Sequence, residues 1–538
     1  MKPWLPSADP TLPYRPLRIV SGAAVALAVA ALIAVLFSAI VGAAASQPPL
    51  AAARYDLGYL LWITTAQATL STLFSLIVGI ALAWALNRLR FPGRNLVVGL
   101  FASAIVTPGL IVAFGLLSVW GRNGWLSRSS DALFGAPLDI SIFGLGGVVA
   151  AHIILDGAFA ARILLARLDA LPEARLKTGQ SLALSGWQRF TIIDWPAMRG
   201  TLPGLGAVIF LLAFTSFPIV LLLGGGPAVQ TLEVAIYSAV RLDFDLNAAV
   251  TLALAQIAVC AAIILLSSAF SPIPTSLSQP AAMHWCDSIA ARSGQWFVLV
   301  LCLLGFGLPL VAVLGDGLTG ALSLAASASF WNAILTSLGI ATASAVLALV
   351  LSLAVAASRA ASSLRWFRIA VGVPAYAYLA VPAVALSLGA FLFVRELGIA
   401  PETAAPLVVI VANALLALPF ALATLGPAFD AIVRSRGKLM RSIGLSGARQ
   451  FREIEWPILA GDIGIVVALA FCFSLGDLGV IALFGTQDFV TLPLYMLRAL
   501  GAYRTNDAAA VAALMLVLTI AAFVLIPRLF ERLGRARA

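Results

Sequence analysis

Two polar stretches of the chain follow one pattern: KTGQSLALSGWQRFTIIDWP at residues 177–196 and KLMRSIGLSGARQFREIEWP at residues 438–457. Their offset is a constant 261 residues (457 − 196), nearly half of the 538-residue chain. A polar stretch repeated at that distance predicts two related halves whose repeats do the same job on the same side of the molecule. The nine identical pairs are Lys177/Lys438, Ser181/Ser442, Leu184/Leu445, Ser185/Ser446, Gly186/Gly447, Phe190/Phe451, Ile193/Ile454, Trp195/Trp456 and Pro196/Pro457.

The composition is typical of a membrane protein. Hydrophobic residues make up 62% of the chain and charged residues 10%, whereas soluble domains contain about 45–50% and about 25%. Lipid must therefore solvate much of the apolar surface, and we predict an all-α polytopic membrane protein with about twelve transmembrane helices in two halves of six. The apolar runs lie near residues 20–46, 59–86, 95–119, 142–168, 203–224, 247–270, 295–315, 331–358, 367–394, 405–427, 462–485 and 507–528.

The runs and the repeats together divide the chain into five parts. We expect a tail (1–19), a first half (20–270) with its polar loop at 169–202, a linker (271–294), a second half (295–528) with its loop at 428–461, and a second tail (529–538). If the spans alternate, 26 of the 33 Lys and Arg residues lie on the side of the repeats and seven on the other. Basic residues accumulate in cytoplasmic loops, so both termini, the linker and both repeats are predicted to be cytoplasmic. The net charge of +10 then needs no nucleic-acid partner.

The chain lacks the residues that catalytic and nucleotide-binding motifs require. A P-loop needs G-x-x-x-x-G-K-[ST], and of the three lysines only Lys438 follows a glycine, with Leu439 in place of the hydroxyl residue. Four cysteines and two histidines are too few and too scattered for a metal cluster. We therefore expect no enzyme activity and no metal or cofactor bound by this chain. Energy for transport would come either from an ion gradient or from a separate ATPase.

Each repeat reads as a partly helical loop. The first part favours a helix at residues 171–184 and 432–445, and a Ser-Gly pair follows, where glycine lets the chain turn. A second short amphipathic stretch leads to Trp-Pro, and we expect this proline to stop the helix before the next span. A membrane subunit that is powered by ATP hydrolysis in another protein needs one such docking loop in each half. The duplication favours docking loops over ordinary polar loops.

The two repeats resemble the EAA loops of binding-protein-dependent ABC importer permeases. That motif places Glu-Ala-Ala 19 residues before a proline and a glycine six residues after the glutamate. This chain has Lys177 and Lys438 at the glutamate position, and Ala183 and Gly444 at the glycine position. The resemblance implies ATPase-coupling roles for Lys177, Ser181, Ala183, Ser185, Gly186 and Pro196 in the first loop, and for Lys438, Ser442, Gly444, Ser446, Gly447 and Pro457 in the second.

The fused twelve-span form resembles permeases for thiamine and its phosphates, and more distantly those for iron(III). The similar stretches are RFPGR (90–94), FGLLSVWGRNGWL (114–126), LGGGPAVQTLEVAIY (223–237) and SLGDLGVIALFGTQDFVTLPLYMLRALGAYRTND (474–507). The resemblance implies two fused type I ABC importer permease halves in a bacterial inner membrane. Its implied partners are a periplasmic thiamine-binding protein and two copies of an ATPase that holds ATP and Mg. An iron(III) permease and an ion-coupled secondary transporter remain the alternatives.

Three polar residues within predicted spans are candidates for the transport path. Asp156 lies one helical turn from His152, and Asp477 lies in the apolar run before Gly485. Charge at membrane depth is costly and marks a candidate transport path, and acidic walls suit a cation such as thiamine. The structural alternative is that Asp156 pairs with His152 and that Asp477 bonds backbone freed near Gly476 and Gly479. Both interpretations stay open at this point.

Overall fold

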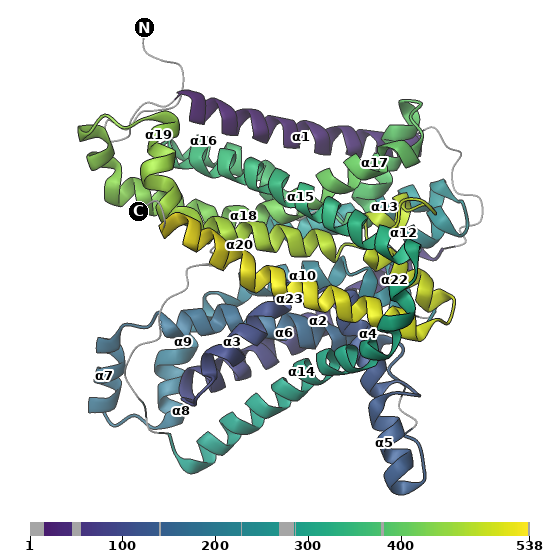
Figure 1. The fold of residues 1–538 in the computed structure, drawn as a ribbon. Helices are drawn as coiled ribbons and strands as arrows, with labels where there is room; N and C mark the ends of the chain where they lie inside the picture. Colours follow the sequence, from purple (N-terminus) through teal and green to yellow (C-terminus); the bar gives the residue numbers. More distant parts are fainter. Residues whose placement is uncertain are drawn as a thin grey trace.

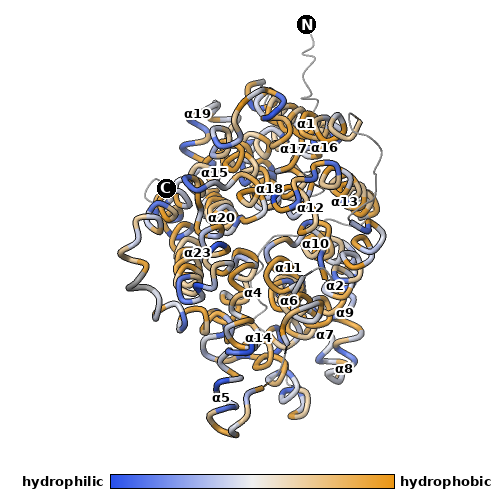
Figure 2. Tube along the Cα trace, turned by 90° about the vertical axis from the view of Figure 1, so that its right-hand side faces the viewer, coloured by the Kyte–Doolittle hydropathy of each residue, from blue (hydrophilic) through white to orange (hydrophobic). Residues whose placement is uncertain are grey.

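The computed structural model describes residues 16–45, 55–138, 141–226, 229–267, 285, 287–377 and 381–535. Within those residues the chain is helical and has no strand, which confirms the predicted all-α class. Hydrophobic colour predominates along the helices in Figure 2. The fold is therefore organised by helix packing alone, as a lipid environment requires of a chain that satisfies its own backbone hydrogen bonds.

Fifteen elements lie in the described residues of the first half, most of them separated by short breaks. They are α1 (Pro16–Ala45), α2 (Leu57–Arg88), α3 (Arg94–Ala102), η1 (Ser103–Ile105), α4 (Gly109–Trp120), α5 (Trp125–Phe134), α6 (Leu145–Asp169), α7 (Glu173–Ser181), α8 (Gly186–Arg189), η2 (Phe190–Asp194), α9 (Trp195–Arg199), α10 (Leu202–Phe214), α11 (Pro218–Leu223), α12 (Leu232–Arg241) and α13 (Leu246–Ser267).

The second half repeats this order in longer pieces. Its elements are α14 (Ile289–Ala325), α15 (Ala328–Ala360), α16 (Arg365–Ala377), α17 (Ala383–Glu396), α18 (Pro401–Ser442), α19 (Gly447–Gln450), η5 (Phe451–Glu455), α20 (Trp456–Leu475), α21 (Ile481–Phe484), α22 (Leu492–Gly501) and α23 (Thr505–Arg535).

Nine helices in the described ranges are long and apolar enough to cross a membrane. Two bent pairs pass the same test together, with bends of 113° after Ile105 and 58° after Arg199, which brings the number to eleven. The first bend comes just before Pro108, whose ring and missing N–H prevent α3 from running on into α4. The remaining run predicted from the sequence, 367–394, corresponds to α16 and α17 and includes residues 378–380, which lie outside the described residues.

The two halves interlock through the first helix of each. Helix α1 packs on α15, α16 and α17 of the second half, while α14 packs on α2 and α4 of the first. Glycines allow these close approaches: a Cβ on Gly115 would lie 2.6 Å from the carbonyl oxygen of Pro309, and one on Gly389 would lie 2.9 Å from that of Leu36. Gly115 and Gly389 hold equivalent places in α4 and α17, so the exchange follows the internal repeat.

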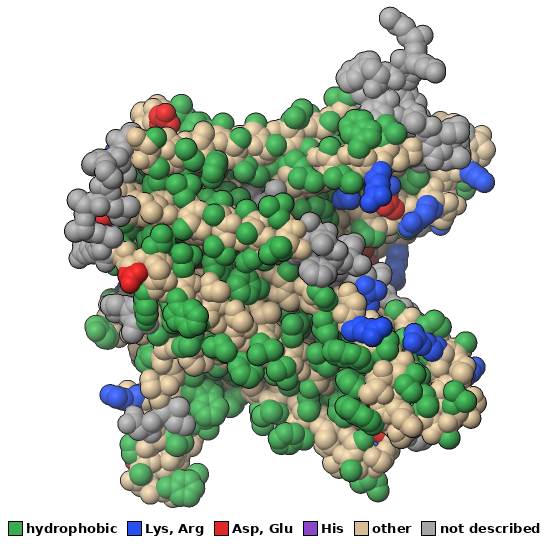
Figure 3. Space-filling view, turned by 180° about the vertical axis from the view of Figure 1, so that it is seen from behind, with side chains coloured by type: hydrophobic (Ala, Val, Ile, Leu, Met, Phe, Trp, Pro, Cys, Tyr) green, Lys and Arg blue, Asp and Glu red, His purple; other side chains and the backbone are tan. Residues whose placement is uncertain are grey.

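Both repeat loops lie at the same end of the molecule. Figure 1 shows α7, α8 and α19 at the left, together with the start of α1 and the end of α23, and α5, α12 and α22 at the right. Seen from behind in Figure 3, blue Lys and Arg side chains gather at the right, which is the loop end of Figure 1. The fold thus brings the duplicated loops and most of the visible basic surface to one side of the apolar bundle.

Candidate functional site

The first helix of each repeat loop ends in the same backbone turn. Ala183 and Gly444 both have left-handed backbones, with φ of +51° and +65°. In each loop the amide two residues beyond the helix cap bonds back to a carbonyl in the last helical turn, as in a Schellman motif. These bonds run from Leu184 N–H to Gly179 O (3.2 Å) and from Leu445 N–H to Met440 O (3.0 Å). The motif's glycine position is therefore the turning point, and Ala183 adopts there a conformation that favours glycine.

The Ser-Gly pairs begin the second helix of each loop. Ser185 caps α8: its Oγ accepts from the Gln188 N–H at 3.3 Å, and the Gln188 side chain accepts from the Ser185 N–H at 2.8 Å. Ser446 occupies the same cap position before α19, and Gly447 has a φ of +59°. The predicted turn at the glycine is therefore right for Gly447 and wrong for Gly186, which has no positive φ and forms the first residue of α8.

The prediction that Trp-Pro stops the helix before the next span is wrong for the second loop, and in the first loop the helix ends at Arg199, three residues beyond Pro196. The chain stays helical through Pro196 and Pro457, and Gly447–Leu475 forms one candidate span. A π-helical turn, η2 or η5, immediately precedes each Trp-Pro. There the N–H of Trp195 bonds to Phe190 O, five residues back, and Trp456 bonds to Phe451 O in the same way. The wider turn makes room for a ring that would otherwise clash with the carbonyl four residues back.

The side chains of Lys177, Ser181 and Ser442 make contacts within their own helices. Lys177 pairs with Glu173 at 2.9 Å, one turn earlier, and both side chains are largely exposed. The hydroxyls of Ser181 and Ser442 donate to carbonyls three residues back, at 2.9 and 2.8 Å. Large apolar side chains stand out beside them: Trp187 is 73% exposed and Leu182 67%. The outer face of the loops therefore combines exposed apolar and basic groups, which is typical of a surface that another protein covers.

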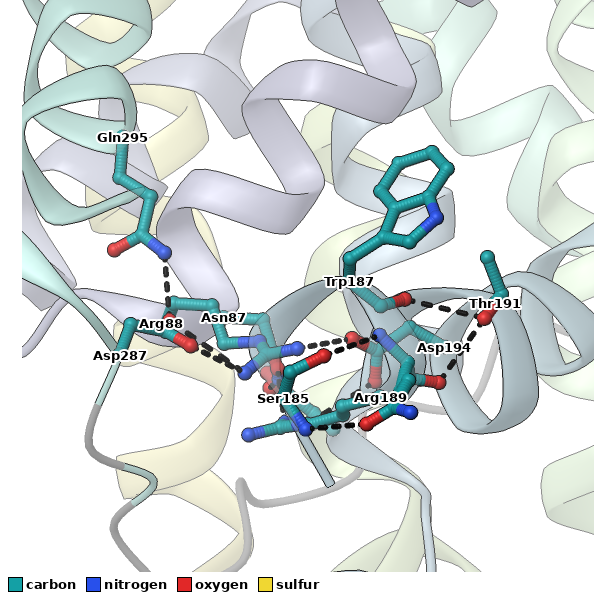
Figure 4. A network of polar contacts seen from close by, with 11 residues as sticks. Asn87, Arg88, Ser185, Trp187, Arg189, Thr191, Asp194, Asp287 and Gln295 are labelled. Atoms are coloured by element: carbon teal, nitrogen blue, oxygen red, sulfur yellow. Dashed lines mark hydrogen bonds and ion pairs between the residues drawn. The ribbon is translucent and has the colours of Figure 1, made fainter. Parts of the chain in front are cut away.

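A buried acid anchors the base of the first loop. Asp194, the residue before Trp-Pro, is 0% exposed and pairs with Arg88 at the end of α2 at 2.6 Å. Arg88 also contacts Asp287 at 3.2 Å, and Gln295 of α14 donates to Asp287 at 2.7 Å (Figure 4). Arg189 completes the network, at 3.4 Å from the other Asp194 oxygen. The loop is thus tied to α2 of its own half and, through Asp287, to the crossing helix α14.

Arg189 belongs to the polar loop at 169–202, before the apolar run 203–224, and keeps its charge in this network. Burial lowers its pKa to about 10, and the positive charge of neighbouring Arg88 adds to this effect. Asp194 and Asp287 oppose the shift, and the guanidinium stacks over the Trp285 ring at 4.6 Å. At neutral pH the group remains a cation that neutralises Asp194.

The second loop has an equivalent anchor from a different helix. Glu455 occupies the position of Asp194, and its side chain is 1% exposed. Arg18 of α1 binds both of its oxygens at 2.7 Å, and Gln450 also donates to it. Each loop is therefore connected to the helix that crosses over from the other half. Arg18, Arg88 and Asp287 were missed as site residues because their partners are far away in the sequence. The one available signal was that both repeats carry an acid before Trp-Pro.

His152 and Asp156 form a buried pair on α6. Nδ1 of His152 lies 3.0 Å from Oδ2 of Asp156, while its Nε2 has no partner. The Ser75 hydroxyl of α2 donates to the His152 carbonyl at 3.4 Å, where α6 packs on α2. The structural alternative from the sequence is thus realised for Asp156. A role in the transport path stays a prediction.

Asp477 lies in the break between α20 and α21. Its Oδ1 accepts from the Val480 N–H at 3.3 Å, and Oδ2 has no partner. A Cβ on neighbouring Gly476 would lie 2.6 Å from Pro108 Cγ, so this break packs on the start of α4 in the other half. Asp477 thus bonds freed backbone, as its structural alternative predicted, and it does so at the contact between the halves. Within the described ranges, no three His, Cys, Asp or Glu side chains gather as metal ligands.

Comparison with known proteins places the chain in a family. No protein-family model matches it. The thiamine transport system permease protein of Brucella melitensis is 38% identical over 490 residues, which cover 89% of each chain. The protein of that name from Escherichia coli is 36% identical over 473 residues, covering 86% of this chain and 87% of its own. The sulfate transport system permease protein CysT of Escherichia coli is 26% identical over 208 residues, 38% of this chain. The chain therefore belongs to the family of thiamine transport system permease proteins.

Proposed function

We propose that this chain is the membrane-spanning subunit of a bacterial inner-membrane ABC importer, and that it moves thiamine or a thiamine phosphate into the cytoplasm. The proposal is supported by relatives named for thiamine transport that match almost 90% of the chain. They do not favour an iron(III) permease or an ion-coupled secondary transporter. The observation that carries the mechanism is the common build of the two loops, each with a left-handed turn, a short second helix that follows a serine, and a π-turn before Trp-Pro.

The energy comes from two copies of a separate ATPase, one on each loop, which hold ATP and Mg. This chain has no P-loop of its own, and its loops offer exposed apolar and basic groups such as Trp187 and Lys177. Beyond Pro457 the loop continues into the span as one helix, Gly447–Leu475. In the second half, a shift of the docked ATPase therefore moves a continuous helix rather than a flexible linker. The ion pair from Arg18 to Glu455 carries the same movement to α1.

Both loops and both termini face the cytoplasm in this proposal, and a periplasmic thiamine-binding protein docks at the opposite end, near α5, α12 and α22. The gathering of Lys and Arg at the loop end supports that orientation (Figure 3). Closure of the ATPases on ATP favours the outward-open arrangement of the halves, and hydrolysis returns them to the inward-open one.

The test is uptake of labelled thiamine by proteoliposomes that contain this chain, its ATPase and the binding protein. We expect uptake only with hydrolysable ATP, and competition by thiamine phosphates but not by iron(III). Uptake by vesicles that contain this chain alone, driven by an ion gradient, would contradict the proposal.

A further inference from the structure

A row of polar side chains crosses the contact between the halves. It starts at Gln256 of α13, whose Nε2 donates to Glu233 Oε1 of α12 at 3.2 Å. Helix α12 contacts α17 and α21 of the second half. Asp477 precedes α21, and its N–H bonds to Ser474 O at 3.4 Å. Asn413 Nδ2 of α18 in turn donates to Ser474 Oγ of α20 at 3.0 Å. The row therefore joins two elements of the first half to three segments of the second.

The unused polar atoms of this row are all hydrogen-bond acceptors. Glu233 Oε2, Gln256 Oε1, Asn413 Oδ1 and Asp477 Oδ2 have no partner. Glu233 and Gln256 are 0% exposed and Asn413 is 1% exposed, so water does not satisfy these acceptors from the surface. An unsatisfied buried acceptor costs about 1–3 kcal/mol, and more if it is charged. Such a set complements a ligand that brings positive charge and N–H donors.

Hydrogen bonds account for only one oxygen of each acid. Glu233 Oε1 accepts from the Gln256 side chain, and Asp477 Oδ1 accepts from the Val480 N–H. Each carboxyl is thereby held in place while its second oxygen has no partner. These internal bonds leave four buried acceptors at one contact without a donor.

The internal repeat shows that the framework does not need these acids. Helices α12 and α22 begin alike: Leu232 N–H donates to Thr64 Oγ1 at 3.1 Å, and Leu492 N–H donates to Ser337 Oγ at 2.7 Å. The next residue is Glu233 in the first half but Pro493 in the second. Likewise, the place of Asp477 in the second half is taken by Ser216 in the first, 261 residues earlier. The two halves thus contribute one acid each, from different positions, to one shared contact.

We propose that Glu233 and Asp477, with the amide oxygens of Gln256 and Asn413, recognise the cationic substrate as it passes between the halves. The inference rests on the proposed function, since thiamine carries a positive thiazolium ring and an amino group that donates hydrogen bonds. Glu233 is fully buried, and the free Oδ2 atom of Asp477 is buried as well. The substrate therefore reaches both acids when the halves move apart.

The test compares a cation with an uncharged analogue in the complete reconstituted transporter. We measure KM for uptake of thiamine and of its triazole analogue with wild type, Glu233→Gln and Asp477→Asn. Each variant should raise the KM for thiamine about ten-fold, the loss of one charge-assisted bond, and leave that for the analogue unchanged. Glu402→Gln, an exposed acid at the start of α18, is the matched control and should change neither value.

Membrane yield and co-purification of the ATPase show whether a variant assembles. Glu233→Asp keeps the charge, so we expect a thiamine KM between those of wild type and Glu233→Gln. It also provides the readout at this position if Glu233→Gln fails to assemble. If the assembled variants keep the wild-type ratio of the two KM values, the inference is wrong. If wild type itself shows no ATP-dependent thiamine uptake, the proposed function fails instead.

Discussion

The left-handed turns of the two loops predict that Gly444→Ala and Ala183→Gly change the local stability of their loops in opposite directions. Gly444 has a φ of +65° and a Cβ added there would meet nothing within 4 Å, so Gly444→Ala adds strain without a clash. Ala183 has a φ of +51° and is exposed, so Ala183→Gly removes strain without losing packing. A left-handed alanine costs roughly 1–2 kcal/mol, and the smaller freedom of alanine in the unfolded chain offsets about 0.4–1 kcal/mol of this. The net change is about 0.5–1 kcal/mol, destabilising for Gly444→Ala and stabilising for Ala183→Gly.

Amide hydrogen exchange measures this change locally, without requiring the whole membrane protein to unfold reversibly. The amides of Leu445 and Leu184 close the two turns. Their protection should fall about two- to five-fold in Gly444→Ala and rise by the same factor in Ala183→Gly. Peptides from the unchanged loop of each variant serve as the internal control. Changes of the same sign in the two variants would refute the assignment of both positions to the left-handed turn.

Two further predictions concern the loops. Gly444→Arg and Ala183→Arg should release or uncouple the ATPase while leaving membrane insertion intact, because the loops lie outside the apolar spans. Co-purification of the ATPase and substrate-stimulated ATP hydrolysis measure these effects. If both variants kept full ATPase binding and full stimulation, the docking role of the loops would be contradicted. Arg18→Ala should destabilise the protein by about 3 kcal/mol, because it leaves the buried Glu455 carboxylate unpaired. The midpoint of thermal unfolding in detergent should therefore fall in Arg18→Ala. The control Arg535→Ala removes an exposed contact with Glu531 and should leave the midpoint unchanged. Equal midpoints for the two variants would count against the Arg18–Glu455 pair as an anchor of the second loop.

Several features of the fold could be predicted because they depend on local or summed properties. The apolar runs follow from the solvent that a spanning helix needs, and twelve runs in the sequence correspond to nine described spanning helices and two bent pairs, with the remaining run only partly described. The shared end of the two loops follows from the spacing of the repeat. Residues such as Gly444, at the glycine position of the motif, could be singled out because a tight turn is encoded by the residues that form it.

The prediction for Trp-Pro failed for a reason that is also local but less regular. Proline normally ends a helix because its ring clashes with the carbonyl four residues back. Here a single π-turn shifts that carbonyl and lets α9 and α20 continue. A wider turn forms only where surrounding contacts support it, and for η5 that support comes from Glu455, which α1 holds in place.

The sequence by itself determined the membrane class, the two-fold repeat and the loops, because hydrophobicity and spacing act along the chain. Only the tertiary structure decided that α1 and α14 exchange between the halves, that Arg18 meets Glu455 across 437 residues, and that α12 with Glu233 packs on α17 and α21 of the other half. The sequence does not distinguish the arginine that pairs with a buried acid from the other arginines, because packing selects that residue. Burial then makes the pairing consequential, because a charge away from water needs a specific partner.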